Sequence, residues 1–183
     1  LAPQVVLLVD GVRRIDATLW SDDGTGGSHP GVAASYAAGV VRCDLRNGQA
    51  EVVDWQVDRG LFTSSADAAD LTAGQVTYLV HRVETTDPRK LELAVQPALT
   101  ELEMAISARV RARTRDCDDL LVVDGPLRKR RDLARTIGYI KSHHRNYLPA
   151  RHTQVVTGLS AGQRSPVFRE GTIWDNYTWY LRL

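Results

Sequence analysis

The chain has 183 residues, of which 43% are apolar and 25% charged, and its formal net charge is +1. These values are ordinary for a soluble globular protein, and a net charge near zero neither favours nor excludes a nucleic-acid partner, because local patches matter more than the sum. No apolar run approaches the roughly 18 residues that a membrane-spanning helix needs. Two cysteines, Cys43 and Cys117, form no disulfide framework, so we expect a cytoplasmic protein. The chain begins at Leu1 and stops on an aromatic run, and we expect it to be truncated at both ends.

The first third of the chain predicts an antiparallel meander. Residues 4–9 form a run of branched apolar side chains, which is typical of a buried strand, and residues 13–20 alternate well enough to predict a second strand. A loop rich in Gly, Ser and Asp should follow over residues 21–31. Residues 33–45 and 50–63 are then expected to pair as a hairpin, because Asn47-Gly48 between them is a strong two-residue turn signal.

A long helix is expected over residues 87–116. Asp87 can cap it and Pro88 suits its first position, whereas Pro97 should kink or restart it. Before this helix, residues 64–74 suggest a loop or a short helix, and residues 75–84 fit a strand or a helix equally well.

Several shorter strands are expected after the helix. They cover residues 120–124, 137–141, 155–156, 166–168 and 178–183. With no repeat and no convincing linker, we expect one domain over residues 1–183. The predicted fold class is α/β, with a mixed sheet of antiparallel meander and further strands flanked by helices. This order resembles the RNase H-like arrangement.

Two Asp-Gly pairs end strand-like runs far apart in the sequence, at Asp10-Gly11 and Asp124-Gly125. If their strands are neighbours in one sheet, the two carboxylates converge and repel one another. Folds that bring carboxylates together usually place a divalent cation between them, so the pattern indicates a metal-dependent site. The alternative is that each Asp starts a turn.

The long helix offers acidic candidates for the same site. At about 100° per residue, Glu103 lies at the edge of the apolar stripe formed by Leu99, Leu102 and Ile106, whereas Glu101 lies nearly opposite it. Glu103 is therefore the better candidate to face the sheet. Glu92 is also available.

Motifs after Asp124 make the chain resemble the NurA nuclease family. The resemblance spans nearly the whole chain, and the order of the segments carries it. The matching segments are Asp124-Gly125-Pro126-Leu127, Ile137-Gly138-Tyr139-Ile140-Lys141-Ser142, Gly162-Gln163-Arg164-Ser165-Pro166-Val167-Phe168 and Trp179-Tyr180-Leu181-Arg182-Leu183.

This resemblance implies a DNA nuclease of RNase H-like fold that uses Mn²⁺ or Mg²⁺. It further implies a homodimer that processes DNA ends in repair together with a hexameric HerA-type ATPase. By the same resemblance Asp10, Glu103 and Asp124 would be the catalytic metal ligands, Lys141 would lie beside the scissile phosphate, and Tyr180 would match a late aromatic position. The family's last metal-site residue, often a His, has no counterpart before Leu183.

Basic and aromatic residues suggest where DNA would bind. Arg128, Lys129, Arg130 and Arg131 follow Asp124 and could hold phosphates, or could form a solvated basic face. Nothing near His143 and His144 has the spacing of a zinc site, and these residues could instead contact DNA beside Lys141 or be simply exposed. The late aromatic residues, Tyr180 among them, suit either base stacking or core and dimer packing.

The sequence is also compatible with two other functions. The chain could be a non-catalytic partner that keeps the fold and scaffolds a DNA-processing ATPase. It could also be another RNase H-like enzyme, such as a Piwi-type slicer or a sugar-kinase-like ATPase. A Piwi-type slicer would need a guide-binding domain, which this length excludes unless that domain has been cut away, and Gly11-Val12-Arg13-Arg14 is a poor phosphate loop.

Overall fold

The computed structural model describes residues 2–22, 24–113, 118–142, 147–170 and 176–183. Contacts divide the chain into two compact units, Leu1–Tyr139 and Ile140–Leu183, and each is described by itself. The expectation of a single domain stays a prediction.

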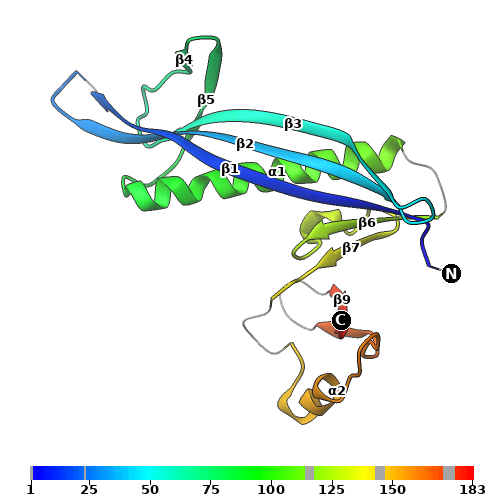
Figure 1. The fold of residues 1–183 in the computed structure, drawn as a ribbon. Helices are drawn as coiled ribbons and strands as arrows, with labels where there is room; N and C mark the ends of the chain where they lie inside the picture. Colours follow the sequence, from blue (N-terminus) through cyan, green and yellow to red (C-terminus); the bar gives the residue numbers. More distant parts are fainter. Residues whose placement is uncertain (1, 23, 114–117, 143–146, 171–175) are drawn as a thin grey trace. The chain divides into compact units, whose positions relative to one another are not determined.

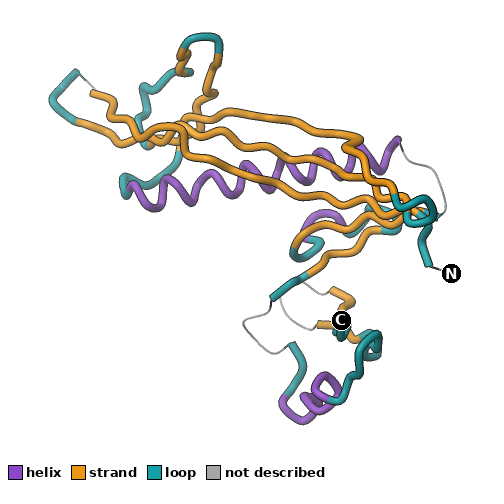
Figure 2. Tube along the Cα trace, in the orientation of Figure 1, coloured by secondary structure: helices purple, strands orange, loops and turns teal. Residues whose placement is uncertain are grey.

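The first unit contains most of the regular structure (Figures 1 and 2). Its strands are β1 (Val5–Asp22), β2 (Ser28–Asp44), β3 (Gln49–Thr63), β4 (Leu71–Ala73), β5 (Val76–Arg82), β6 (Asp119–Asp124) and β7 (Thr136–Tyr139). Its helical segments are the long helix α1 (Pro88–Arg113) and the short 3₁₀ helix η1 (Arg128–Arg130).

These strands form one mixed sheet in the order β4-β5-β3-β2-β1-β6-β7. The β1–β2 and β2–β3 pairs are antiparallel, whereas β1–β6 and β6–β7 are parallel. The α/β class and the mixed sheet are therefore confirmed. The meander β1–β2–β3 is confirmed in its order, and α1 forms the crossover that leads to β6.

The two strands expected over residues 4–9 and 13–20 are a single strand, so that expectation was wrong. Asp10 and Gly11 continue the ladder and pair with Gly39 and Ala38 of β2. The register shifts only at a bulge between Ile15 and Ala17. An Asp-Gly pair favours a turn locally, but cross-strand hydrogen bonds to β2 keep the segment extended.

The turn at Asn47-Gly48 lies where the sequence predicts it. The Asp44 carboxylate accepts the backbone N–H of Arg46 at 3.0 Å and of Asn47 at 3.1 Å. Gly48 has φ of 64°, which glycine adopts without steric cost. Residues 75–84, left open between strand and helix, contain β5, which pairs in parallel with β3.

Helix α1 starts where its cap predicts. Asp87 Oδ1 accepts the backbone N–H of Arg89 at 3.0 Å, and Pro88 is the first helical residue. The assigned helix continues through Pro97 to Arg113. One side of α1 is buried against β1, β2 and β3, and together with buried residues of β6 this is the main core of the unit. Its helical members are Leu91, Val95, Leu99, Leu102, Ile106 and Val110.

The second unit is smaller. It holds the 3₁₀ helix η2 (Ala150–His152), the helix α2 (Thr153–Thr157) and a hairpin of β8 (Phe168–Glu170) and β9 (Asn176–Thr178). The strand expected over residues 155–156 was wrong, because these residues lie in α2, whose end is capped by a Gly158 N–H bond to the Gln154 carbonyl at 3.0 Å. In the described parts of the chain, no helix is long and apolar enough to cross a membrane.

Candidate functional site

Asp10 and Asp124 lie next to each other on neighbouring strands. Strands β1 and β6 are parallel, and Val9 is the register partner of Val123. One position further along both strands therefore places the two aspartates side by side, at the usual strand spacing of about 4.8 Å. The sequence-based expectation that these two residues converge holds for the backbone.

Both aspartates project from the same face of the sheet. Val9 and Val123 are buried in the core beneath α1. Because side chains alternate along a strand, Asp10 and Asp124 point to the opposite face, where both are exposed. The Asp10 Oδ1 accepts the backbone N–H of Gly11 at 2.8 Å. Both carboxylates therefore lie on the exposed face of the sheet, at the carboxyl end of β6.

Glu103 lies on the other side of the sheet, on α1. Gly11 lets the helix approach β1 closely, because a Cβ there would lie 2.7 Å from Glu103 Oε1 and 2.7 Å from Leu99 Cδ1. The prediction that Glu103 faces the sheet is correct, and Glu101 is exposed as expected. Strand alternation places Asp10 and Asp124 on the face of the sheet away from α1, so Glu103 and the two aspartates lie on different faces.

Arg130 is the immediate partner of Glu103. Its guanidinium donates to Glu103 Oε2 at 3.3 Å, and the arginine side chain is only 3% exposed. Burial raises the pKa of Glu103, the Arg130 charge opposes that rise, and the negative charge of Asp10 adds to it. Burial also lowers the pKa of the Arg130 guanidinium.

A divalent cation fits this arrangement only in part. Asp10 and Asp124 offer adjacent, exposed carboxylates, which are the hard oxygen ligands that Mn²⁺ and Mg²⁺ take. Glu103 Oε2 is engaged by Arg130 at 3.3 Å, and the role of Glu103 as a third ligand stays a prediction. Within the described residues, no three His, Cys, Asp or Glu side chains come together as a metal site.

The basic run after Asp124 is divided between the surface and the core. Arg128, Lys129 and Arg131 are exposed and remain available to phosphates, and Arg128 also donates to Thr100 Oγ1 at 3.3 Å. Arg130 is instead buried against Glu103, and its expected DNA contact stays a prediction. Four consecutive basic residues look alike in the sequence, so nothing in it separates the buried Arg130 from its exposed neighbours.

The remaining predicted residues belong to the second unit or lie outside the described residues. Lys141 is exposed in the second unit. Tyr180 stacks on Phe168 with ring centroids 5.9 Å apart, and its hydroxyl accepts the Tyr147 backbone N–H at 3.2 Å. Tyr180 therefore packs within that unit, and its expected contact with DNA stays a prediction. His143 and His144 are outside the residues that the structure describes.

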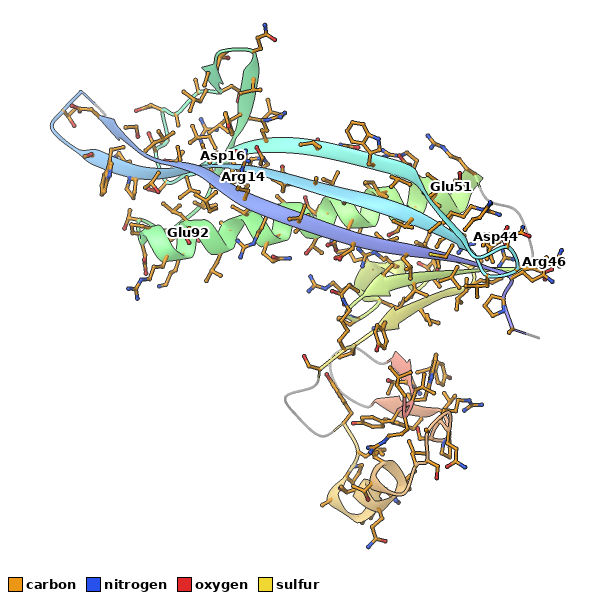
Figure 3. The ribbon with its side chains drawn as sticks, in the orientation of Figure 1. Arg14, Asp16, Asp44, Arg46, Glu51 and Glu92 are labelled. Carbon is orange, nitrogen blue, oxygen red and sulfur yellow. The ribbon has the colours of Figure 1, made fainter. Side chains whose placement is uncertain are left out.

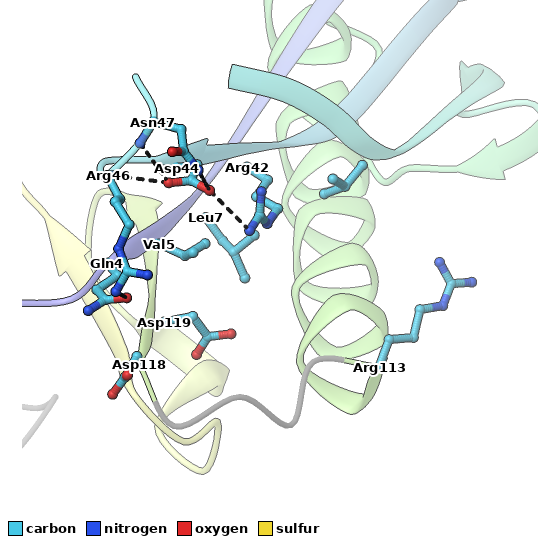
Figure 4. Close-up of a pocket in the computed structure, with 11 residues that line it drawn as sticks. Gln4, Val5, Leu7, Arg42, Asp44, Arg46, Asn47, Arg113, Asp118 and Asp119 are labelled. Carbon is cyan, nitrogen blue, oxygen red and sulfur yellow. Dashed lines mark hydrogen bonds and ion pairs between the residues drawn. The ribbon is translucent and has the colours of Figure 1, made fainter. Parts of the chain in front are cut away.

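The first unit also has a polar cavity of about 570 Å³ at the start of β1 and β6, on the α1 side (Figure 4). Asp119 contributes to its wall and is itself held by Arg111 at 2.6 Å. The cavity is separate from Asp10 and Asp124, which do not line it. Its other charged and amide residues are Gln4, Arg42, Asp44, Arg46, Asn47, Arg113 and Asp118.

Two comparisons with known proteins, one with family models and one with curated sequences, gave no match. No family model matches the chain, and no curated protein matches its sequence.

Proposed function

We propose that this chain is a metal-dependent DNA nuclease of RNase H-like fold, related to the NurA nucleases, which hydrolyses phosphodiester bonds. The order β3-β2-β1-β6-β7 supports the fold, because an antiparallel meander leads through one helix into two parallel strands. The observation that carries the proposal is the Asp10–Asp124 pair, since both Asp-Gly motifs directly follow Val9 and Val123, the last register pair of β1 and β6.

On this proposal, the chain's own residues would bind the ion and supply positive charge near it. Asp10 and Asp124 would hold a Mn²⁺ or Mg²⁺ ion on the open face of the sheet. When bound, such an ion supplies Lewis acidity and lowers the pKa of bound water. Arg128, Lys129 and Arg131 would contribute positive charge after β6. Homodimer formation and action with a HerA-type ATPase in DNA end resection are parts of the proposal that rest on the sequence resemblance.

The test is cleavage of end-labelled linear DNA with Mn²⁺ by the chain and by its Asp10→Ala and Asp124→Ala variants. Asp67→Ala is the matched control, because Asp67 is exposed and lies outside the carboxylate pair. We expect the control to cleave normally and both site variants to lose more than about 100-fold, since even the partners of metal ligands typically contribute about 10- to 100-fold. Equal cleavage by all four proteins would reject the assignment.

A second readout separates binding from catalysis. Mn²⁺ should raise the melting temperature of the chain and of Asp67→Ala, and this shift should disappear in the two site variants. The stabilisation depends on ion binding to the folded state, so it needs no cleavage.

A non-catalytic scaffold is the second candidate. The Glu103–Arg130 ion pair favours it, because a guanidinium occupies the carboxylate that the nuclease would use as a third ligand. On this candidate the chain would bind DNA or an ATPase while neither Mn²⁺ nor Mg²⁺ supports cleavage or shifts the melting temperature.

A further inference from the structure

Another cavity of the first unit, about 620 Å³ in volume, is lined by residues of β2, β3, β5 and α1, elements that can be followed in Figures 1 and 3. Strands β3 and β5 begin to pair only at Gly60 and Leu79, so the two strands are separate ahead of these residues. Ala98 and Ala105 of α1 line the cavity, and their short side chains leave room between helix and sheet. The volume is within the range typical of small-molecule sites.

Helix α1 and strand β3 bring two acidic residues to this cavity. Arg109 of α1 donates to Asp54 of β3 at 2.7 Å, which fixes one point of contact between the two elements. Glu101 lies two helical turns before Arg109, a rise of about 12 Å. Asp58 lies four residues after Asp54 on the same face of β3, a rise of about 13 Å. Because Glu101 and Asp58 both line the cavity, they face each other much as Arg109 faces Asp54.

The two carboxylates of this cavity have no cationic partner in the described part of the chain. Asp58 accepts hydrogen bonds from the Gln56 amide, at 3.0 Å to Oδ1 and 3.1 Å to Oδ2, and that amide is neutral. Arg59 also contributes to the cavity wall, but alternation along β3 directs its side chain away from the face of Asp58. Like charges that face each other repel, so the Asp58–Glu101 arrangement favours a cation between them.

Tyr36 brings a hydroxyl to the same cavity. The residue is 6% exposed, pairs with Asp58 across β2 and β3, and lines the cavity. Among the described residues its hydroxyl has no hydrogen-bond partner, whereas the Tyr78 hydroxyl donates to Asp16, labelled in Figure 3, at 3.2 Å. Burial raises the pKa of Tyr36, and the negative charges of Asp58 and Glu101 add to that rise, so the hydroxyl is protonated at neutral pH. Buried hydroxyls normally have a partner, so this one points to a ligand in the cavity.

The remaining walls of the cavity are mainly apolar and aromatic. Val57, Leu79 and Leu102 line it together with the two alanines. The His81 ring stacks on Phe62 with ring centroids 4.7 Å apart, so this ring is a fixed part of the wall. Apolar side chains stabilise a hydrocarbon group by removing it from water. A metal ion fits the cavity less well, because nowhere in the described ranges do three His, Cys, Asp or Glu side chains come together as a metal site.

We propose that this cavity binds a small primary amine on a hydrocarbon stem, with its ammonium group held by Asp58, Glu101 and the Tyr36 hydroxyl. An ammonium group has three N–H donors, which match the oxygens of these three side chains. The inference goes beyond the proposed nuclease function. The amine site lies on the α1 side of the sheet, whereas Asp10 and Asp124 lie on the exposed face, so either proposal can fail without the other.

Isothermal titration calorimetry with hexylamine tests the inference, and hexanol serves as the neutral analogue with the same stem. We expect hexanol to bind at least about tenfold more weakly than hexylamine, the size of effect typical for hydrogen bonds to a charged group. Asp58→Asn and Glu101→Gln each remove one charge with little change of shape, and each should weaken amine binding about tenfold. Glu92→Gln is the matched control and should bind as the parent chain does, because Glu92 is exposed on the same helix outside the cavity (Figure 3).

Ala105→Leu tests the cavity without changing a charge. Ala105 is exposed on α1, and leucine is a good helix former, so the variant fills the cavity at little cost to the helix. We expect it to lose hexylamine binding while its melting temperature stays close to that of the parent chain. Ala108→Leu, at an exposed position of α1 outside the cavity, should bind normally. Tyr36→Phe keeps the ring and removes the hydroxyl, so it should weaken binding about threefold.

Three results would overturn the inference. These are no measurable binding of hexylamine by the parent chain, equal binding of hexylamine and hexanol, and equal binding of hexylamine by the Glu101→Gln and Glu92→Gln variants. Loss of amine binding in Asp10→Ala would place the amine at the other face and would also reject it. Amine binding by a chain that cleaves no DNA would reject the nuclease proposal alone, and cleavage by a chain that binds no hexylamine would reject this inference alone.

Discussion

The Arg111 guanidinium donates to the Asp119 carboxylate at 2.6 Å, with the two side chains only 7% and 1% exposed. This buried ion pair joins the last turns of α1 to the first residue of β6. Arg135, which lies in the segment before β7, donates to the same carboxylate oxygen at 2.7 Å. The pair thereby helps to hold β6 between β1 and β7, which is the placement that brings Asp124 beside Asp10.

Replacing Asp119 should destabilise the first unit strongly. Asp119→Asn leaves the buried Arg111 charge without its counter-ion, and breaking a buried pair in this way costs about 3 kcal/mol. Urea denaturation measures the free energy of unfolding. Asp118→Asn is the matched control, because Asp118 is the exposed neighbour, and equal stability of the two variants would contradict the structural role of the pair.

Glu103 and Arg130 should show strong energetic coupling. Glu103→Met leaves a buried guanidinium unpaired, and Arg130→Met leaves a half-buried carboxylate unpaired, so each variant should lose about 2 kcal/mol of stability. The double variant removes both charges and should recover most of that loss. A double-mutant cycle by chemical denaturation measures the coupling, and additive single effects would show that the ion pair contributes nothing.

Asp54 should make stability depend on pH in the acid range. A hydrogen bond from Arg109 at 2.7 Å is the main reason that the pKa of Asp54 lies below its usual value of 3.8. The ionised form is favoured in the folded state, so this stabilisation is present above pH 3.8 and is lost as the pH falls through the lowered pKa.

Denaturation of the parent chain and of Asp54→Asn between about pH 2 and 6 checks this sign. The stability difference between the two proteins should shrink as the pH falls. A constant difference over that range would show that Arg109 does not favour the ionised carboxylate.

Gly138 should be far less tolerant of a side chain than Gly39. A Cβ on Gly138 would lie 2.4 Å from the Gly125 carbonyl oxygen and 2.9 Å from the Leu127 backbone nitrogen. The turn that follows Asp124 would have to move, so Gly138→Ala should cost on the order of 2 kcal/mol. Gly39→Ala meets only ordinary contacts and should change stability by less than about 0.5 kcal/mol. Thermal denaturation of both variants compares them, and similar melting temperatures would argue against the close approach.

Local signals in the sequence predicted the parts of the fold that a few neighbouring residues decide. The Asn47-Gly48 turn and the start of α1 at Pro88 are both found as expected. A turn residue or a cap forms its hydrogen bonds within two or three positions, so the information lies in the segment itself. Asp10 and Asp124 became candidates for a similar reason, because each follows a run of branched apolar residues.

Two features could not be predicted from local sequence, because they depend on segments that lie far away in the chain. The continuation of β1 through Asp10-Gly11 depends on β2, and the strand expected at residues 155–156 is part of a helix. A short apolar run is compatible with both structures until its partners are known.

The sequence by itself determined which residues could form a site, namely two strand-end aspartates and a glutamate at the edge of a helical stripe. Only the tertiary structure decided how they lie. Strand alternation put Asp10 and Asp124 on the open face together with Trp55, whereas the packing of α1 put Glu103 on the other face against Arg130. The face of a side chain follows from register, and register is fixed by hydrogen bonds between segments that are far apart in the chain.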